Sequence, residues 1–123
     1  MASSLLVIST STELIRVQQD RVIFIASNGN YSTITTGGGD ELVVTYQLGQ
    51  IETILASQFG DDDDTFVRIG KQLIVNINYI YYINITRQKL VLKDYSDRKY
   101  ELSASREALK QLKALFENEG GEG

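Results

Sequence analysis

The chain has 123 residues, of which 42% are hydrophobic, a net charge of −4, and no His, Cys, Trp or Pro. That length suits one domain with one modest hydrophobic core. Without His the chain lacks the commonest general base and the Ser-His and Cys-His nucleophile pairs, and without Cys it lacks thiolate metal sites, so we predict no enzyme, no cofactor and no metal centre.

The first half of the chain has the pattern of short antiparallel strands. Runs rich in β-branched residues predict strands over residues 5–9, 13–18, 21–26, 31–36 and 41–46. Ser27-Asn28-Gly29-Asn30 predicts a tight turn, because Asn-Gly readily adopts positive φ. In the strand at 21–26, simple alternation places Val22, Phe24 and Ala26 on one face.

A short helix and an acidic loop follow these strands. Leu48, Ile51 and Leu55 recur at helical spacing and predict a helix over residues 48–57. The four consecutive Asp residues at 61–64 lack the spaced ligands of a calcium loop, so we interpret them as a solvated acidic loop.

The segment at 66–83 is the most informative part of the chain. Its two basic residues, Arg68 and Lys71, flank a short turn between two apolar runs, and a buried strand alone would have little use for cations there. A meander with strands at 79–84, 88–93 and 98–102 is expected after it. Alternation predicts Tyr79 and Tyr81 on one face of the first of these strands, and Tyr82 on the other.

A C-terminal helix is expected to close the domain. Ser105 has the residue type and position of an N-cap, and Glu107 lies in the first turn, where the helix dipole favours an acid. The apolar stripe consists of Ala108, Leu109, Leu112, Leu115 and Phe116. We predict one domain over residues 1–117 and a disordered acidic, glycine-containing tail over residues 118–123.

Charge is distributed unevenly along the chain. Residues 1–66 hold two basic and nine acidic residues, a net charge of −7, whereas residues 67–113 hold ten basic and four acidic residues, a net charge of +6. Binding to phosphate depends on local positive density, so the acidic total does not exclude nucleic acid. No apolar run approaches membrane-spanning length and no signal peptide is evident, so we expect a cytoplasmic protein that does not bind membranes.

Four segments, over about residues 13–112, together resemble the LytTR DNA-binding domain. These are the strand and turn at 21–31, the short helix at 48–55, the core motif at 66–83 that begins Phe-x-Arg and continues to Ile-Val-Asn, and the closing strand at 90–93 followed by Leu-Ser-Ala-Ser-Arg at 102–106. Two positions depart from the family pattern. Ala26 lies where the family often has Glu, and Gly70 lies where it often has His.

The resemblance implies a mainly β fold, with small antiparallel sheets in an elongated arrangement, one short helix in mid-chain and one at the C-terminus. It implies sequence-specific binding of double-stranded DNA, through loops and strand ends in the major groove, by the output domain of a bacterial response regulator in a two-component system. The DNA-binding residues carried over by motif are Asn30, Tyr31, Ser32, Arg68, Lys71, Gln72, Arg106 and Lys110. Two copies are expected on direct repeats, with self-association limited to a weak homodimer and no small-molecule substrate.

Structural roles compete with DNA contact for several of these residues. Arg68 could instead pair with the acidic loop at 61–64, and Tyr31 could fill the core. Asn76 lies between two apolar residues, so we expect its side chain to hydrogen-bond backbone groups at a strand end rather than to contact DNA. The alternative function is a β-rich protein-interaction module that pairs through an exposed strand edge. A third is single-strand binding through Tyr31 and the tyrosines at 79–82.

Overall fold

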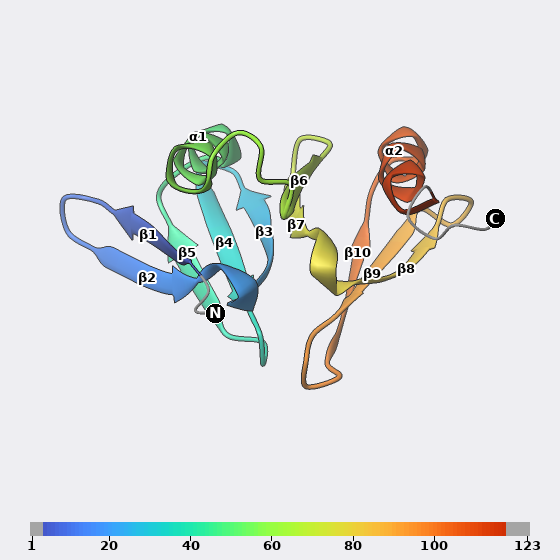
Figure 1. The fold of residues 1–123 in the computed structure, drawn as a ribbon, viewed down its shortest axis with the longest axis horizontal. Helices are drawn as coiled ribbons and strands as arrows, with labels where there is room; N and C mark the ends of the chain where they lie inside the picture. The colour runs from blue at the N-terminus through green and yellow to red at the C-terminus, as the bar shows by residue number, and fades with distance from the viewer. Residues whose placement is uncertain (1–3, 118–123) are drawn as a thin grey trace.

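The mainly β architecture expected from the sequence is confirmed in a computed structural model that describes residues 4–117. Three small antiparallel sheets and two helices form an elongated molecule (Figure 1). The elements are β1 Leu5–Ser9, β2 Leu14–Gln18, β3 Val22–Asn28, β4 Tyr31–Thr36, β5 Glu41–Val44, α1 Leu48–Phe59, β6 Phe66–Ile69, β7 Leu73–Asn76, β8 Ile80–Asn84, β9 Lys89–Lys93, β10 Lys99–Ser103 and α2 Arg106–Glu117. The tail at 118–123 lies outside the described residues.

The five-stranded sheet at the centre has the order β5-β4-β3-β7-β6. The hairpin of β1 and β2 lies on one side of the molecule, and the meander of β8, β9 and β10 lies on the other with α2 (Figure 1). The central sheet is therefore covered by different elements on its two faces.

Each face of the central sheet contributes to a separate hydrophobic core. One core joins the sheet to the β1–β2 hairpin and α1, and it includes Leu6, Ile51 and Ile74. The other joins the sheet to β9 and α2, and it includes Leu90 and Leu109. Burial of these apolar side chains on both faces of β3 and β7 stabilises the two halves as one folded unit.

The simple alternation predicted for residues 21–26 is wrong, because β3 contains a bulge. Its register against β4 shifts between Val22 and Phe24. Val22 packs in the core with α1, whereas Phe24 and Ala26 pack against the core with α2. A bulge inserts one residue and so reverses the side-chain phase beyond it.

A second bulge changes the faces predicted for the tyrosines. The register of β8 against β9 shifts between Ile80 and Tyr82. Tyr81 and Tyr82 are consequently both exposed, at 54% and 45%, although they are adjacent in sequence. Tyr79 is half-buried, and its hydroxyl donates a hydrogen bond to the Asp20 carbonyl.

The predicted start of the C-terminal helix is confirmed. The Ser105 hydroxyl accepts a hydrogen bond of 3.1 Å from the Ala108 amide, and the Ser105 carbonyl accepts the first helical hydrogen bond, from Leu109. α1 begins as predicted at Leu48 and extends to Phe59, two residues beyond the predicted end. No helix within residues 4–117 has the length and hydropathy needed to cross a membrane.

Asn76 has the structural role assigned to it from the sequence. It is fully buried, its side-chain amide donates to the Val22 carbonyl at 2.9 Å, and its side-chain oxygen accepts from the Asn78 amide at 3.0 Å. These bonds satisfy backbone groups where β7 ends, and full burial keeps the side chain from contact with an external ligand.

A buried carboxylate joins the two halves of the molecule at the end where β9 turns into β10. Asp94 is 4% exposed and accepts hydrogen bonds from the Tyr100 hydroxyl at 2.7 Å and from the amide of Gly38, in the β4–β5 connection, at 3.0 Å. Ser96 and the Arg98 amide also donate to it. Burial alone would raise the pKa of Asp94, but these hydrogen bonds outweigh it and hold the pKa well below the ordinary value of 3.8.

We therefore expect Asp94→Asn to lower the free energy of unfolding by about 2–4 kcal/mol at pH 7, because an amide cannot accept all of these donors. Because the folded-state pKa is depressed, the contribution is complete above the unfolded pKa and is lost as pH falls through the folded pKa. The difference between wild type and variant should then shrink below about pH 4. Urea unfolding of both proteins at several pH values measures this difference in the free energy of unfolding. Asp97→Asn, at an exposed position of the same turn, is the control. Equal effects of the two substitutions would contradict this role.

Candidate nucleic-acid interface

The two turns predicted to bind DNA are neighbours because of strand pairing. β3 and β7 are antiparallel, with Ala26 opposite Leu73, so the end of β3 lies beside the start of β7. The Ser27 amide extends this ladder by donating to the Gln72 carbonyl at 2.9 Å. The β3–β4 turn and the β6–β7 turn therefore emerge at the same edge of the central sheet.

The start of α2 reaches the same edge. α2 contacts β6 and β8, and Leu109, in its first turn, belongs to the same buried cluster as Ile69 and Leu73. Those two residues flank the β6–β7 turn. Figure 1 shows both turns and the beginning of α2 along the upper edge of the molecule. Segments more than thirty residues apart in sequence thus form one edge.

The β3–β4 turn presents two of its three predicted contact residues. Gly29 adopts a φ of 77°, which suits the Asn-Gly turn, and Asn30 and Tyr31 are exposed, Tyr31 at 48%. Ser32 is fully buried, and its hydroxyl donates to the Tyr46 carbonyl at 2.6 Å. The expectation that Ser32 contacts DNA is therefore wrong for this structure, because the side chain points into the protein.

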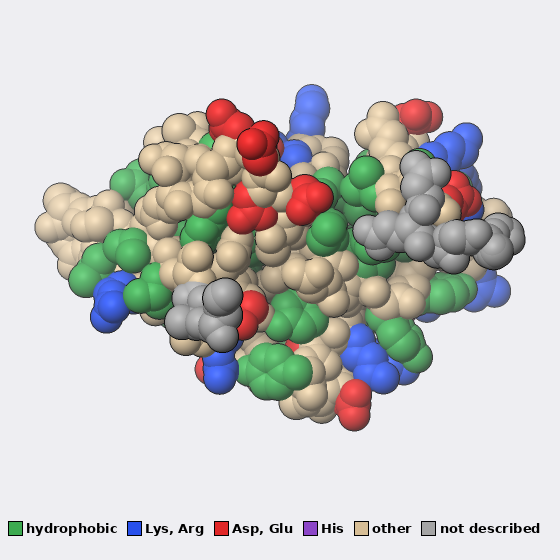
Figure 2. Space-filling model, viewed as in Figure 1, with side chains coloured by type: hydrophobic (Ala, Val, Ile, Leu, Met, Phe, Trp, Pro, Cys, Tyr) green, Lys and Arg blue, Asp and Glu red, His purple; other side chains and the backbone are tan. Residues whose placement is uncertain are grey.

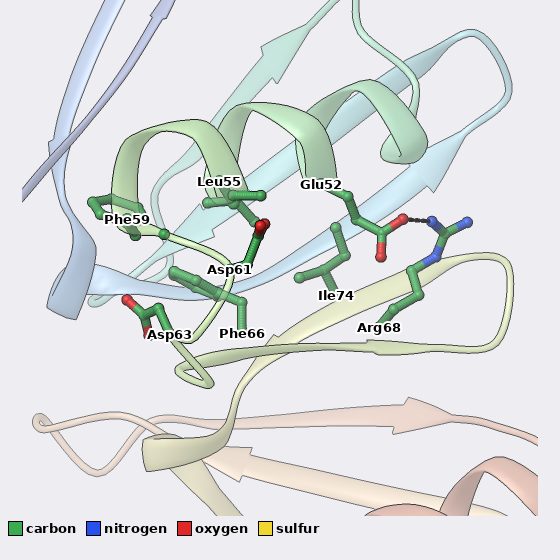
Figure 3. Close-up of a pocket in the computed structure, with 10 residues that line it drawn as sticks. Glu52, Leu55, Phe59, Asp61, Asp63, Phe66, Arg68 and Ile74 are labelled. Carbon is green, nitrogen blue, oxygen red and sulfur yellow. Dashed lines mark hydrogen bonds and ion pairs between the residues drawn. The ribbon is translucent and has the colours of Figure 1, made fainter.

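The β6–β7 turn presents Lys71 and Gln72 to solvent, whereas Arg68 is directed into the turn itself. Arg68 Nε donates to the Gly70 carbonyl at 3.0 Å, and Nη2 donates to the Lys71 carbonyl at 3.1 Å. Its Nη1 lies 2.6 Å from a carboxylate oxygen of Glu52 in α1 (Figure 3). The guanidinium thus has three protein acceptors.

The acidic loop at 61–64 is not the partner of Arg68. A pocket of about 240 Å³ separates α1 from β6, and Figure 3 shows Arg68 and Glu52 at one end of it, with Asp63 at the other. Asp63 instead accepts hydrogen bonds from Gln19 and from the Thr65 amide. Burial would raise the pKa of Asp63, but its hydrogen bonds with Thr65 and Gln19 outweigh this and lower it.

The first turns of α2 present Arg106 and Lys110, both exposed. Arg106 Nη2 donates to the Thr86 carbonyl, in the β8–β9 turn, at 3.1 Å, which orients the guanidinium along this edge. Lys110 lies one helical turn later and forms no ion pair within the described residues. Lys113, a further turn away, pairs with Glu117.

Two positions were missed by sequence reasoning, and both orient predicted contact residues. Glu52 anchors Arg68 from α1, and the Thr86 carbonyl anchors Arg106. Helical spacing places Glu52 on a polar face of α1, but nothing in the sequence indicates which strand that face would meet. A backbone carbonyl carries no sequence signal at all.

Acidic side chains gather on one part of this surface, and basic side chains stand on others. Figure 2 shows acidic side chains over α1 and the loop after it, a basic side chain above the β6–β7 turn, and both basic and acidic side chains beside α2. Tyr81 lies away from the turns, with Lys93 Nζ 4.8 Å and Lys99 Nζ 5.1 Å from its ring centre. The edge with the two predicted turns and the start of α2 is therefore distinct from the face that bears Tyr81.

Comparison with known proteins gives a family and a similar structure. The sequence model of the LytTr DNA-binding domain matches residues 12–117. The fold is similar to the solved LytTr DNA-binding domain of a Bacillus cereus protein described as a methyl-accepting/DNA response regulator, with a TM-score of 0.58 and 19% identity, covering 98% of this chain and 100% of that one. No curated protein sequence matches the chain.

The different burial of Ser32 and Asn30 predicts different costs of substitution. Ser32→Ala leaves the Tyr46 carbonyl without its donor in a partly buried site, so we expect the free energy of unfolding to fall by about 1–2 kcal/mol. Asn30→Ala alters an exposed turn and should change it by less than about 0.5 kcal/mol. Urea unfolding at neutral pH measures both variants. A larger loss for Asn30→Ala would show that the turn is more tightly packed than its exposure indicates.

Proposed function

Because the chain belongs to the LytTR family of DNA-binding domains, we propose that it binds duplex DNA sequence-specifically as the output domain of a cytoplasmic bacterial response regulator. The observation that carries the proposal is the meeting of three predicted segments at one edge, through β3–β7 pairing and the packing of α2 on β6. Loops and strand ends, rather than a single recognition helix, would then enter the major groove.

The exposed side chains at this edge have the chemistry for both kinds of DNA contact. Arg106 presents a guanidinium that can donate to O6 and N7 of one guanine, and Asn30 or Gln72 can pair with adenine. Lys71 and Lys110 are suited to phosphate as point charges, and Tyr31 can pack on a thymine methyl group or donate to phosphate. Arg68 is assigned no base contact, because three of its N–H groups already have protein acceptors.

Two copies on direct repeats would extend the contact along one side of the duplex. One domain buries a limited surface, and a second copy about one helical turn away would face the same side of the DNA. The two-component role and the repeat arrangement both come from the family. In vitro selection from a randomised duplex library tests sequence-specific recognition and the repeat arrangement together, because it yields both the recognised sequence and the spacing of its copies.

We expect Arg106→Ala to cost about 1–3 kcal/mol of specific binding and to relax preference at one base pair, because its fork is suited to one guanine. Lys110→Ala should weaken binding to all duplexes alike and lower the slope of log affinity against log salt by about 1. Electrophoretic shift titrations on selected and scrambled duplexes measure both effects.

Lys113→Ala is the matched control, since it removes the same charge from the same helix but from a lysine paired with Glu117. We expect the salt slope of this variant to match that of wild type. A sequence-independent loss for Arg106→Ala would remove its base-reading role. Absence of selected sequences from the library would contradict duplex recognition itself.

Strand addition remains the second candidate function because β5 is an edge strand. β5 ends the five-stranded sheet, and its Val43 is 55% exposed. The free edge of β1 is occupied instead, since the Gln58 side chain hydrogen-bonds both the amide and the carbonyl of Val7. Pairing at β5 would depend little on salt, whereas DNA binding would weaken steeply as salt rises, so retention on immobilised random duplex against salt distinguishes them.

A further inference from the structure

Glu52 and Arg68 together set the shape of the DNA-contacting β6–β7 turn: we propose that they are positioning residues through which α1 holds Lys71 and Gln72 in place. The inference rests on the proposed function and deepens it, since neither residue needs to touch DNA. It assigns a role to a residue of α1, an element that holds none of the predicted DNA-contacting residues, and Figure 3 shows Glu52 of this helix reaching Arg68.

Arg68 binds the backbone of its own hairpin turn, an arrangement that we call the clamp. The turn has three residues, Gly70 to Gln72, between the paired ends Ile69 and Leu73. Arg68 binds the carbonyls of the first two of these residues, and Ser27 binds the carbonyl of the third at 2.9 Å. Every carbonyl of the turn is therefore held by a donor, which leaves the side chains of Lys71 and Gln72 as its outward-facing groups.

Glu52 orients the clamp. An arginine with several rotatable bonds can reach two carbonyls in many ways, but its planar guanidinium can satisfy three acceptors at once only in a narrow range of orientations. The third acceptor is the Glu52 carboxylate, 2.6 Å from Nη1, and α1 is itself fixed by burial of Ile51 and Leu55. The position of α1 is thus transmitted to the turn through one ion pair.

The pair contributes to geometry more than to stability. The side chains of Arg68 and Glu52 are 29% and 47% exposed, and ion pairs exposed to this degree contribute little net free energy because water screens them. Breaking the pair should therefore leave the protein folded. Its effect should appear where the orientation of the turn matters, in discrimination between DNA sequences.

Charge and positioning predict opposite effects when the pair is broken. If Glu52 only neutralised Arg68, Glu52→Gln would free a cation beside the interface and raise affinity for every duplex. If Glu52 positions the turn, Glu52→Gln should lower affinity for the selected sequence roughly threefold to tenfold, without lowering affinity for a scrambled one. The ratio of specific to non-specific affinity separates the two roles.

The experiment compares Glu52→Gln and Arg68→Lys with wild type on selected and scrambled duplexes. Lysine keeps the charge of Arg68 but cannot bind three acceptors in one plane. Arg68→Lys should therefore lower the ratio of specific to non-specific affinity as Glu52→Gln does. Asp97→Asn is the matched control. It adds the same charge as Glu52→Gln and breaks the Lys93–Asp97 pair of 3.5 Å, in the turn at the opposite end of the molecule. This control should keep the wild-type ratio.

A second measurement uses the free protein, so it stands even if no duplex is bound. Amide hydrogen exchange at Ser27, whose amide donates to the Gln72 carbonyl, followed by NMR, should become faster in Glu52→Gln and Arg68→Lys and stay unchanged in Asp97→Asn. Unchanged exchange together with an unchanged affinity ratio would overturn the positioning role. Faster exchange with no duplex bound by wild type would overturn the proposed function and leave the clamp standing.

Discussion

The antiparallel pairing of β3 with β7 is the constraint on which the candidate interface depends. These strands are far apart in sequence, yet their register places Ala26 opposite Leu73 and continues to the bond between the Ser27 amide and the Gln72 carbonyl. Two hairpin turns must then emerge together. A shift of one residue would turn every side chain of β7 to the opposite face and disrupt both cores, so burial enforces this alignment.

The opposite end of the molecule is joined in a different way, by a polar contact. Asp94 binds the Gly38 amide, and the Arg21 guanidinium donates to the Tyr95 hydroxyl at 2.8 Å. These bonds attach the β9–β10 turn to the segments around the central sheet. The apolar core that contains Leu90 and Leu109 attaches the rest of the meander and α2 to the same sheet. Together they fix the position of the start of α2 beside the two hairpin turns.

Local patterns predicted most of the elements, and the differences have specific physical causes. The limits of β1 and β4 follow from their β-branched runs, and the N-cap at Ser105 follows from capping chemistry. The two bulges could not be predicted, because they depend on the partner strand rather than on the strand itself. Among the site residues, the order of the motifs indicated which segments meet. It did not indicate that the Ser32 side chain is buried, or that the carbonyls of Gly70 and Lys71 orient Arg68, because both depend on the tertiary structure.

The acidic net charge of the chain does not determine the charge at the candidate interface, because β6 separates the acidic loop at 61–64 from the turn that carries Lys71. The acidic loop precedes Phe66 and the basic turn follows Ile69, so the strand between them spans about 13 Å at 3.3 Å per residue. That separation exceeds the screening length of about 8 Å at physiological ionic strength, so the loop does little to cancel the potential at Lys71. Glu52 lies closer, but its carboxylate is engaged by Arg68. The field at the upper edge is therefore set by the residues displayed there, and the net charge of the whole chain is a poor guide to it.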